Sequence, residues 1–267
     1  MTNHHGDFIW YELMTPDAEA AARFYASILG WQDRPAEAAA AGAYRIFSAA
    51  GTDVGGLYCT AGDPRCAGSR PAWLGYVGVD DVDASATDVQ AAGGTILMPP
   101  TDIPGVGRFA MIADPQGVPC YVMRGAVDAA STAFAPDTPG HCQWNELTTA
   151  DQQAALAFYG GRFGWQPGDA VDMGELGDYR FLVQRGITIG AVMNAPPGGP
   201  PPMWTFYFGV PDIDRAAAAI VGGGGTVHHG PAEVPGGSRI VVASDPQGAG
   251  FGLVAPPPAT ASKETST

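Results

Sequence analysis

Basic residues are scarce in this sequence. Lysine and arginine together number 13, against 27 aspartates and glutamates, which gives a formal net charge of −14 at pH 7. A protein that binds nucleic acid needs a basic surface to neutralise phosphates, and anionic lipids attract basic segments in the same way. The charge balance therefore argues against nucleic acid and against membranes as partners.

Long apolar stretches are also missing. No hydrophobic run approaches the roughly 20 residues that a membrane-spanning helix needs. The first residues, MTNHHGDF, lack the basic and apolar regions of a secretory signal. We therefore expect a cytoplasmic protein, either a monomer or a homodimer.

Cysteine and histidine are few. The 4 cysteines have no spacing typical of a disulfide framework or a zinc site, so we expect reduced thiols, with a Cys59–Cys66 bridge as the alternative. The 5 histidines are expected to be solvated at the surface. The adjacent His228 and His229 would point to opposite faces of a strand and could not easily bind one ion together.

The sequence does contain a tandem repeat, in which motifs of the first half return in the same order in the second. The aligned segments are Trp10–Asp17 with Trp144–Asp151, Phe24–Tyr25 with Phe158–Tyr159, Gly30–Gln32 with Gly164–Gln166, Tyr44–Arg45 with Tyr179–Arg180, Trp73 with Trp204, Gly93–Thr95 with Gly224–Thr226, Arg108 with Arg239, and Asp114–Gly117 with Asp245–Gly248. We predict a first domain at 1–125, a linker at 126–140, a second domain at 141–256 and a disordered tail at 257–267.

Each copy shows an alternation of strand and helix signals. In the first copy, Phe8–Leu13 is typical of a strand, and Thr15 followed by Pro16 predicts the start of a helix that Gly30 ends in a left-handed cap. A second helix is expected near Val82–Ala92. Further strands are expected at Tyr44–Ser48, Val54–Cys59, Trp73–Val79, Thr95–Met98, Arg108–Ala113 and Cys120–Met123.

These motifs resemble the glyoxalase/bleomycin resistance/extradiol dioxygenase superfamily, also called the vicinal oxygen chelate (VOC) fold. The resemblance rests on Asp17 opening a helix, Phe24–Tyr25, Gly30–Trp31 and the Asp114–Gly117 turn, each found twice. It implies an α+β fold of two tandem VOC domains, each of two βαβββ modules that form a cupped mixed sheet with the site in the cup. The tandem Trp-x-Glu-Leu start is similar to the branch labelled hydroxylase or glyoxalase-like antigen, some of whose members belong to aromatic polyketide antibiotic pathways.

The family name refers to metal chelation, and the resemblance implies where ligands would lie. Members usually carry His or Gln on the first strand, a carboxylate on the last strand and often His at the start of the fifth. The corresponding residues here are Trp10 and Trp144, Tyr121 and Gly252, and Trp73–Leu74 and Trp204–Thr205. Indole, phenol and glycine do not hold a divalent ion, so we expect no metal and no cofactor.

Glu12 and Glu146 are the candidate catalytic residues. Strand alternation puts each on the same face as the tryptophan two residues earlier, and a carboxyl among aromatic residues can have a raised pKa and act as an acid or base. The alternative, which we favour at this point, is a structural ion pair with Arg45 or Arg180. Arg108 and Arg239 are expected to form salt bridges at the rim.

The remaining candidate cup residues are large, flat or flexible and would suit a planar apolar ligand, although core packing explains many such residues equally well. They are Trp10, Tyr58, Tyr76, Phe109, Met111, Tyr121 and Met123 in the first copy, and Trp144, Met193, Tyr207 and Phe251 in the second.

Three functions follow from these observations. The leading hypothesis is a metal-free protein that binds a planar hydrophobic small molecule, such as an antibiotic-like natural product, for sequestration or resistance, or as accessory to a biosynthetic oxygenase. The second is a lyase, isomerase or hydroxylase-type enzyme that uses Glu12 or Glu146. The third is an interaction protein with vestigial cups.

Overall fold

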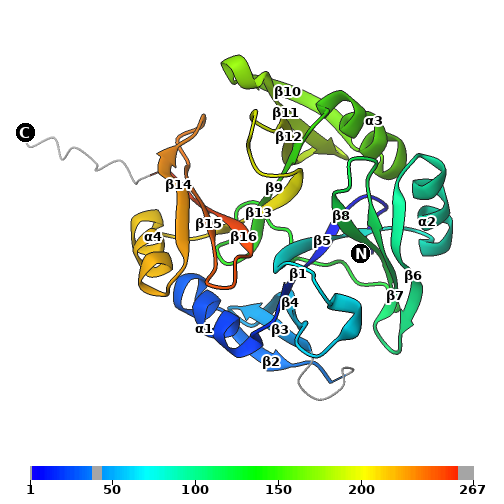
Figure 1. The fold of residues 1–267 in the computed structure, drawn as a ribbon, viewed down its shortest axis with the longest axis horizontal. Helices are drawn as coiled ribbons and strands as arrows, with labels where there is room; N and C mark the ends of the chain where they lie inside the picture. Colours follow the sequence, from blue (N-terminus) through cyan, green and yellow to red (C-terminus); the bar gives the residue numbers. More distant parts are fainter. Residues whose placement is uncertain (1, 38–43, 258–267) are drawn as a thin grey trace, which may run out of the picture.

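The computed structural model describes residues 2–37 and 44–257, which form two eight-stranded mixed sheets, one for each copy of the repeat (Figure 1). This confirms the predicted α+β fold of two tandem domains. The tail predicted to be disordered lies, from residue 258 onward, outside the described residues.

The elements of the two domains follow the same order along the chain. The first domain contains β1 (Phe8–Thr15), α1 (Ala18–Leu29), β2 (Gln32–Pro35), β3 (Tyr44–Ala49), β4 (Thr52–Cys59), β5 (Ala72–Gly78), α2 (Val82–Ala91), β6 (Thr95–Ile103), β7 (Gly107–Ala113) and β8 (Pro119–Gly125). The second contains β9 (Cys142–Thr149), α3 (Gln152–Phe163), β10 (Gln166–Asp172), β11 (Asp178–Gln184), β12 (Ile187–Asn194), β13 (Met203–Gly209), α4 (Ile213–Gly222), β14 (Thr226–Glu233), β15 (Arg239–Ser244) and β16 (Gly250–Ala255).

Each sheet consists of two βαβββ modules joined side by side. In the first sheet the strand order is β2-β3-β4-β1-β5-β8-β7-β6. Within the modules β1 runs parallel to β4 and β5 runs parallel to β8, whereas β1 and β5 are antiparallel and join the two halves. The second sheet repeats this order as β10-β11-β12-β9-β13-β16-β15-β14.

The start of α1 differs from the sequence expectation. Thr15 is the last residue of β1, and Asp17 caps the helix by accepting a hydrogen bond from the backbone N–H of Ala20 at 2.9 Å. Asp17 suits this position because its carboxylate both accepts an orphan N–H and interacts favourably with the positive end of the helix dipole. The predicted left-handed cap at Gly30 is confirmed, with φ of 69°.

Two edge strands differ from the prediction: β2 was not predicted, and β6 was predicted too short. β2 is short and mostly exposed, so it has no alternation of apolar and polar residues to reveal it. β6 continues past Pro99 and Pro100, whereas we predicted an end at Met98. Proline is tolerated there because β6 lies at the edge of its sheet and one side of its backbone needs no partner.

The two domains share one hydrophobic core. α1 lies beside α4, and α2 beside α3, so helices of opposite domains are neighbours (Figure 1). Phe8 of β1 stacks on Trp165 at a centroid distance of 5.1 Å, and the Tyr11 hydroxyl donates to the side-chain oxygen of Asn145 at 2.8 Å. Core side chains from one face of each sheet therefore meet between the domains, and the opposite face of each sheet forms its cup.

Other sequence expectations concern thiols and membranes. The four cysteines are all free, so the alternative of a Cys59–Cys66 bridge is wrong. No helix among residues 2–37 and 44–257 has the length and hydropathy of a membrane span.

Candidate functional site

A row of five side chains crosses the cup face of the first sheet. Trp10 of β1 pairs with Tyr76 of β5, which pairs with Tyr121 of β8. Tyr121 pairs in turn with Met111 of β7, and Met111 with Met98 of β6. Residues directly paired between neighbouring strands place their side chains on one face. The rings of Tyr76 and Tyr121 stack with centroids 4.2 Å apart, so the centre of this face is filled by aromatic surface.

We call this face the first cup. Its apolar residues form a cluster separate from the shared core, and they include five of the residues predicted to bind ligand besides Trp10. The cluster consists of Ile9, Leu74, Tyr76 and Tyr121, with Trp10, Met14, Met98, Phe109, Met111 and Met123 packed against it.

Glu12 is a buried carboxyl on the cup face of the first sheet. It lies two residues after Trp10 on β1, and only 5% of it is exposed. The hydroxyl of Tyr76 donates to Glu12 Oε2 at 2.9 Å. The indole N–H of Trp10 donates to the hydroxyl of Tyr44 at 2.9 Å, and the ring of Tyr44 lies over Gly56, where a Cβ atom would overlap it. The carboxyl therefore accepts a hydrogen bond from Tyr76 on the face of the sheet that also carries Trp10.

Burial controls the protonation of this carboxyl. It raises the pKa of Glu12 from 4.5 to about 7, although hydrogen bonding by Tyr76, Tyr44 and Tyr121 acts in the opposite direction. Burial, followed by the nearby Glu12 charge, raises the pKa of all three tyrosines well above 10. The tyrosines thus remain neutral donors, while Glu12 can exchange a proton near neutral pH.

The second sheet repeats this arrangement at Glu146. The hydroxyls of Tyr179 and Tyr207 donate to its two oxygens at 2.7 and 3.1 Å. The Trp144 indole N–H donates to the Tyr179 hydroxyl at 2.8 Å, as Trp10 does to Tyr44. Burial raises the pKa of Glu146, and hydrogen bonding by the two tyrosines and the charge of His229 lower it. We call the face that carries Glu146 the second cup.

The predicted ion pairs of Glu12 with Arg45 and of Glu146 with Arg180 are wrong. Arg45 forms an ion pair with Asp33, and Arg180 pairs with Asp178 at 2.5 Å, so neither arginine contacts a cup glutamate. Both arginines are half-buried on outer strands. Alternation on β3 and β11 turns each arginine away from the adjacent tyrosine that faces the cup.

The predicted rim salt bridges are confirmed. Arg108 pairs with Asp83 at 2.7 Å and with Asp102 at 3.0 Å, and Arg239 pairs with Asp214 at 2.5 Å. These contacts join the end of a strand to a helix and leave both arginines outside the cups.

The histidines are more varied than expected. His141 is buried, with Nδ1 2.6 Å from the carbonyl oxygen of Thr132, and His5 contacts the carbonyl oxygen of Arg162 with Nε2 at 2.8 Å. His228 is exposed and contacts Ser244. His229 is also exposed, and its pairing with Val242, which pairs with Gly252, places it on the side of the second cup.

Contrary to the prediction, Phe251 does not lie in the second cup. Its ring packs against Phe24 and Tyr25 of the first domain, at centroid distances of 6.1 and 5.3 Å, on the core side of the sheet. The neighbouring position, Gly252, faces the second cup instead. A phase error of one residue on β16 therefore explains the wrong prediction.

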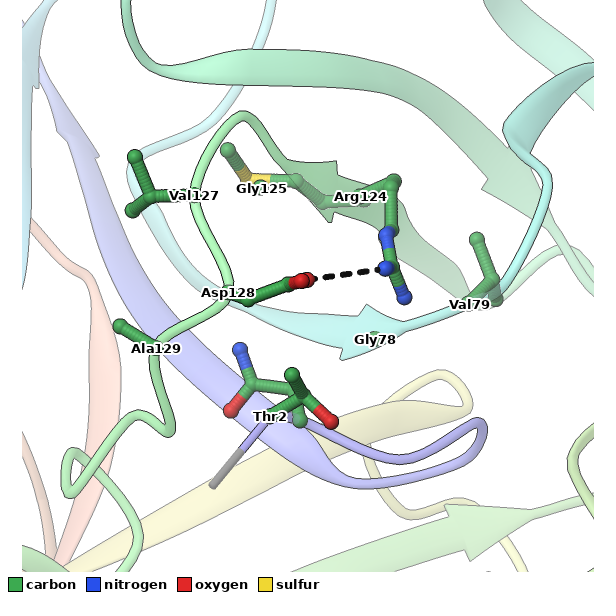
Figure 2. Close-up of a pocket in the computed structure, with 10 residues that line it drawn as sticks. Thr2, Gly78, Val79, Arg124, Gly125, Val127, Asp128 and Ala129 are labelled. Carbon is green, nitrogen blue, oxygen red and sulfur yellow. Dashed lines mark hydrogen bonds and ion pairs between the residues drawn. The ribbon is translucent and has the colours of Figure 1, made fainter.

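Tyr58 and Met123 lie at the margins of the first cup. The Tyr58 hydroxyl is held by Asp63 and Arg65 in the loop before β5. Met123 also lines a cavity of about 10 Å³ between the N-terminal residues and the segment after β8, beside the Arg124–Asp128 ion pair of 3.3 Å (Figure 2). A space of that size holds no more than a water molecule, so this cavity is not a ligand site.

The tyrosines that surround the glutamates were only partly found from the sequence. Tyr76, Tyr121 and Tyr207 were candidates, whereas Tyr44 and Tyr179 were not. The sequence contained a signal for them, because Tyr44 aligns with Tyr179 in the repeat, just as Glu12 aligns with Glu146. Their contact with the glutamates depends on strands far apart in sequence, which the repeat alone does not place together.

The donor set does not fit a family-type divalent ion. The indole N–H groups of Trp10 and Trp144 donate to tyrosines and offer no lone pair. On the fifth strand, Trp73 points to the core and donates to Tyr25 at 2.9 Å, which leaves Leu74 on the cup side. No group of three or more His, Cys, Asp or Glu side chains suited to a metal occurs in the described part of the chain.

Comparison with known proteins gives one family. The model of the Glyoxalase/Bleomycin resistance protein/Dioxygenase superfamily matches residues 8–120 and 138–253. The chain is 35% identical over 252 residues to the glyoxylase-like protein CFP32 of Mycobacterium tuberculosis, covering 93% of this chain and 94% of that protein. It is 33% identical over 266 residues to the anthracycline biosynthesis protein DnrV of Streptomyces peucetius, covering 92% and 91%.

A solved structure shows the same fold. The Mn(II)-bound glyoxalase from Novosphingobium aromaticivorans is similar with a TM-score of 0.65 over 96% of this chain and 83% of that one, at 19% identity. At this identity the likeness concerns the fold and leaves the chemistry of the cups to the residues described above.

Proposed function

Because the chain belongs to the glyoxalase/bleomycin resistance protein/dioxygenase superfamily, we propose that it is a metal-free member that binds a planar, hydrophobic small molecule in a cup. The observation that carries this proposal is a carboxyl in each cup that accepts hydrogen bonds from tyrosine hydroxyls beside a cup tryptophan. Aromatic faces stack on a flat ligand, and methionine adapts to its outline. The carboxyl and hydroxyls then offer hydrogen bonds to polar groups at the ligand edge.

The relatives support an aromatic natural product as the ligand class. One of them is named for anthracycline biosynthesis. Anthracyclines are planar polycyclic aromatics with hydroxyl and quinone oxygens, which matches a wall of rings with a polar floor. In this proposal the protein works in the cytoplasm, where it sequesters such a compound or presents it to a biosynthetic oxygenase. Neither nucleic acid nor a membrane is a partner.

A second candidate function is proton-transfer catalysis by a lyase or isomerase. Burial raises the pKa of Glu12 to about 7, a value suited to an acid or base at neutral pH. Glu146 accepts hydrogen bonds from Tyr179 and Tyr207, the counterparts of Tyr44 and Tyr76 in the repeat, and its pKa is also raised by burial. This candidate uses the same pocket, and it differs from binding alone in requiring turnover that depends on a glutamate.

Tryptophan fluorescence tests the proposal, since Trp10 and Trp144 lie in the two cups. We expect quinizarin, a planar dihydroxyanthraquinone, to quench the protein saturably, and the Phe substitution of whichever of Trp10 and Trp144 lies in the binding cup to reduce the quenched fraction. Val127→Ala, at an exposed residue outside the cups, serves as the matched control. No saturable quenching by quinizarin would contradict ligand binding. Turnover of a bound compound that Glu12→Gln or Glu146→Gln abolishes, with affinity retained, would favour the enzyme.

A further inference from the structure

The two cups differ along the row of paired residues that crosses each sheet. In the second cup Trp144 pairs with Tyr207, and Tyr207 with Gly252. Gly252 pairs with Val242, which pairs with His229. The first-cup row is Trp10, Tyr76, Tyr121, Met111 and Met98. The tryptophan and one tyrosine are therefore shared, whereas the other three positions change from large apolar side chains to glycine, valine and histidine.

The substitutions remove side-chain volume from the second cup. In the first cup Tyr121 stacks on Tyr76 and is 5% exposed, so the ring closes the centre of the cup. Its counterpart Gly252 has no side chain, and the ring of Tyr207 lies over it so closely that a Cβ atom would overlap. The second cup therefore has one aromatic ring fewer, Tyr207 packs over Gly252 in its place, and Val242 is smaller than Met111. Its carboxyl, Glu146, is half-buried, whereas Glu12 is only 5% exposed.

The substitutions also make the second cup more polar. Met14 and Leu74 of the first cup correspond to Thr148 and Thr205 in the repeat. At the far end of the row, His229 on β14 replaces Met98 on β6. His229 is exposed, so an incoming molecule can reach it.

Glu146 and His229 lie on the same face of the second sheet, because Glu146 follows Trp144 by two residues on β9 and His229 ends the row of paired residues that Trp144 begins. The titratable groups that act on Glu146 are Tyr179 from β11, Tyr207 from β13 and His229 from β14. The two tyrosine hydroxyls already donate to the carboxyl oxygens, whereas no hydrogen bond occupies the His229 ring within the described residues. The imidazole is thus available to a ligand, and the first cup has no ionisable group at the equivalent place.

We propose that the second cup is the ligand-accepting one, and that His229 and Glu146 bind the polar edge of a hydroxylated planar aromatic between them. This inference rests on the proposed function and assigns it to one of the two cups. The half-buried Trp144 ring contacts the ligand face, and His229 forms a hydrogen bond with an acidic hydroxyl. The first cup, closed by its own side chains, serves as a structural counterpart.

Exchanging residues between the cups tests this assignment. His229→Met introduces the first-cup residue at an exposed position, where folding tolerates the change. Met98→Ala is the matched control at the equivalent place in the first cup. Equilibrium dialysis would measure the affinity of each full-length variant for quinizarin and for anthraquinone, which lacks the hydroxyls, with circular dichroism as the check on folding.

We expect His229→Met to weaken quinizarin binding by about tenfold or more, because a hydrogen bond to an ionisable group is lost. Anthraquinone affinity should change by less than about twofold, and His229→Gln should recover part of the loss. Met98→Ala should leave both affinities unchanged. If quinizarin binds but Met98→Ala weakens it, or His229→Met does not, the assignment to the second cup is wrong while the proposed function stands. If quinizarin does not bind the unaltered protein, the proposed function itself fails.

Discussion

The hydroxyl of Tyr25 in the first domain donates to the Asp245 carboxylate in the second at 3.1 Å. The equivalent hydroxyl in the second domain, that of Tyr159, donates to Asp114 in the first domain, also at 3.1 Å. Each aspartate opens the Asp-Pro-Gln-Gly turn and accepts backbone N–H bonds inside it, so the turn expected from the sequence is confirmed. Its aspartate has the additional role of joining the domains.

Loss of this contact should destabilise the protein. Tyr25→Phe removes the bond to Asp245 and also leaves the Trp73 indole N–H without its acceptor, which lies 2.9 Å away. We expect the free energy of unfolding to fall by about 2 to 4 kcal/mol, since buried polar groups become unpaired. Urea denaturation of Tyr25→Phe measures this, with Tyr58→Phe as a control outside the interface. Equal stability of Tyr25→Phe and the unaltered protein would show that the contact does not hold the domains together.

Glu12 should make stability fall as pH rises. Its pKa is about 7 in the folded protein and 4.5 as a free side chain, so the folded state binds more protons between these values. The stabilisation that protonated Glu12 gives to the folded state is therefore fully present below about pH 4.5 and is lost as the pH rises through about 7.

Glu12→Gln removes this titration. Relative to that variant, we expect the unaltered protein to lose about 3 kcal/mol between about pH 4 and pH 8, the energy of the shift from 4.5 to about 7. The comparison cancels the contributions of Glu146, Asp114 and Asp245, whose pKa values burial also raises. Parallel stability curves for the two proteins would mean that Glu12 is charged and compensated in the folded state.

Divalent metals should neither bind stoichiometrically nor stabilise the protein. The cup positions Trp10, Leu74 and Tyr121 offer no carboxylate, imidazole or thiolate donor. We expect elemental analysis of the purified protein to find far less than one Mn, Fe, Ni or Zn per domain, and added metal to leave the melting temperature unchanged. A stoichiometric ion lost on Glu12→Gln or Glu146→Gln would mean that the glutamates are ligands.

Local sequence patterns predicted much of the fold and one wall of each cup. Strand alternation correctly placed Trp10 and Glu12 on one face, because side-chain direction in a strand depends only on neighbouring residues. Helix caps and turns were visible for the same reason, apart from the shift from Thr15 to Asp17.

The remaining features depend on contacts that are distant in sequence. Tyr44 meets Trp10 across a gap of 34 residues, and Tyr25 meets Asp245 across 220. A single-residue error in strand phase was enough to exchange Phe251 for Gly252. Likewise, the location of His229 and Glu146 on one face of the second sheet follows from strand order and register, which neither residue type reveals.

Calorimetric titration of quinizarin into the unaltered protein tests most directly whether a cup accepts a planar aromatic. The account predicts saturable binding of one quinizarin per chain, and loss of most of the binding heat in Trp144→Ala but not in Trp10→Ala. Absence of saturable binding, or equal binding by the Trp144→Ala variant, would contradict it.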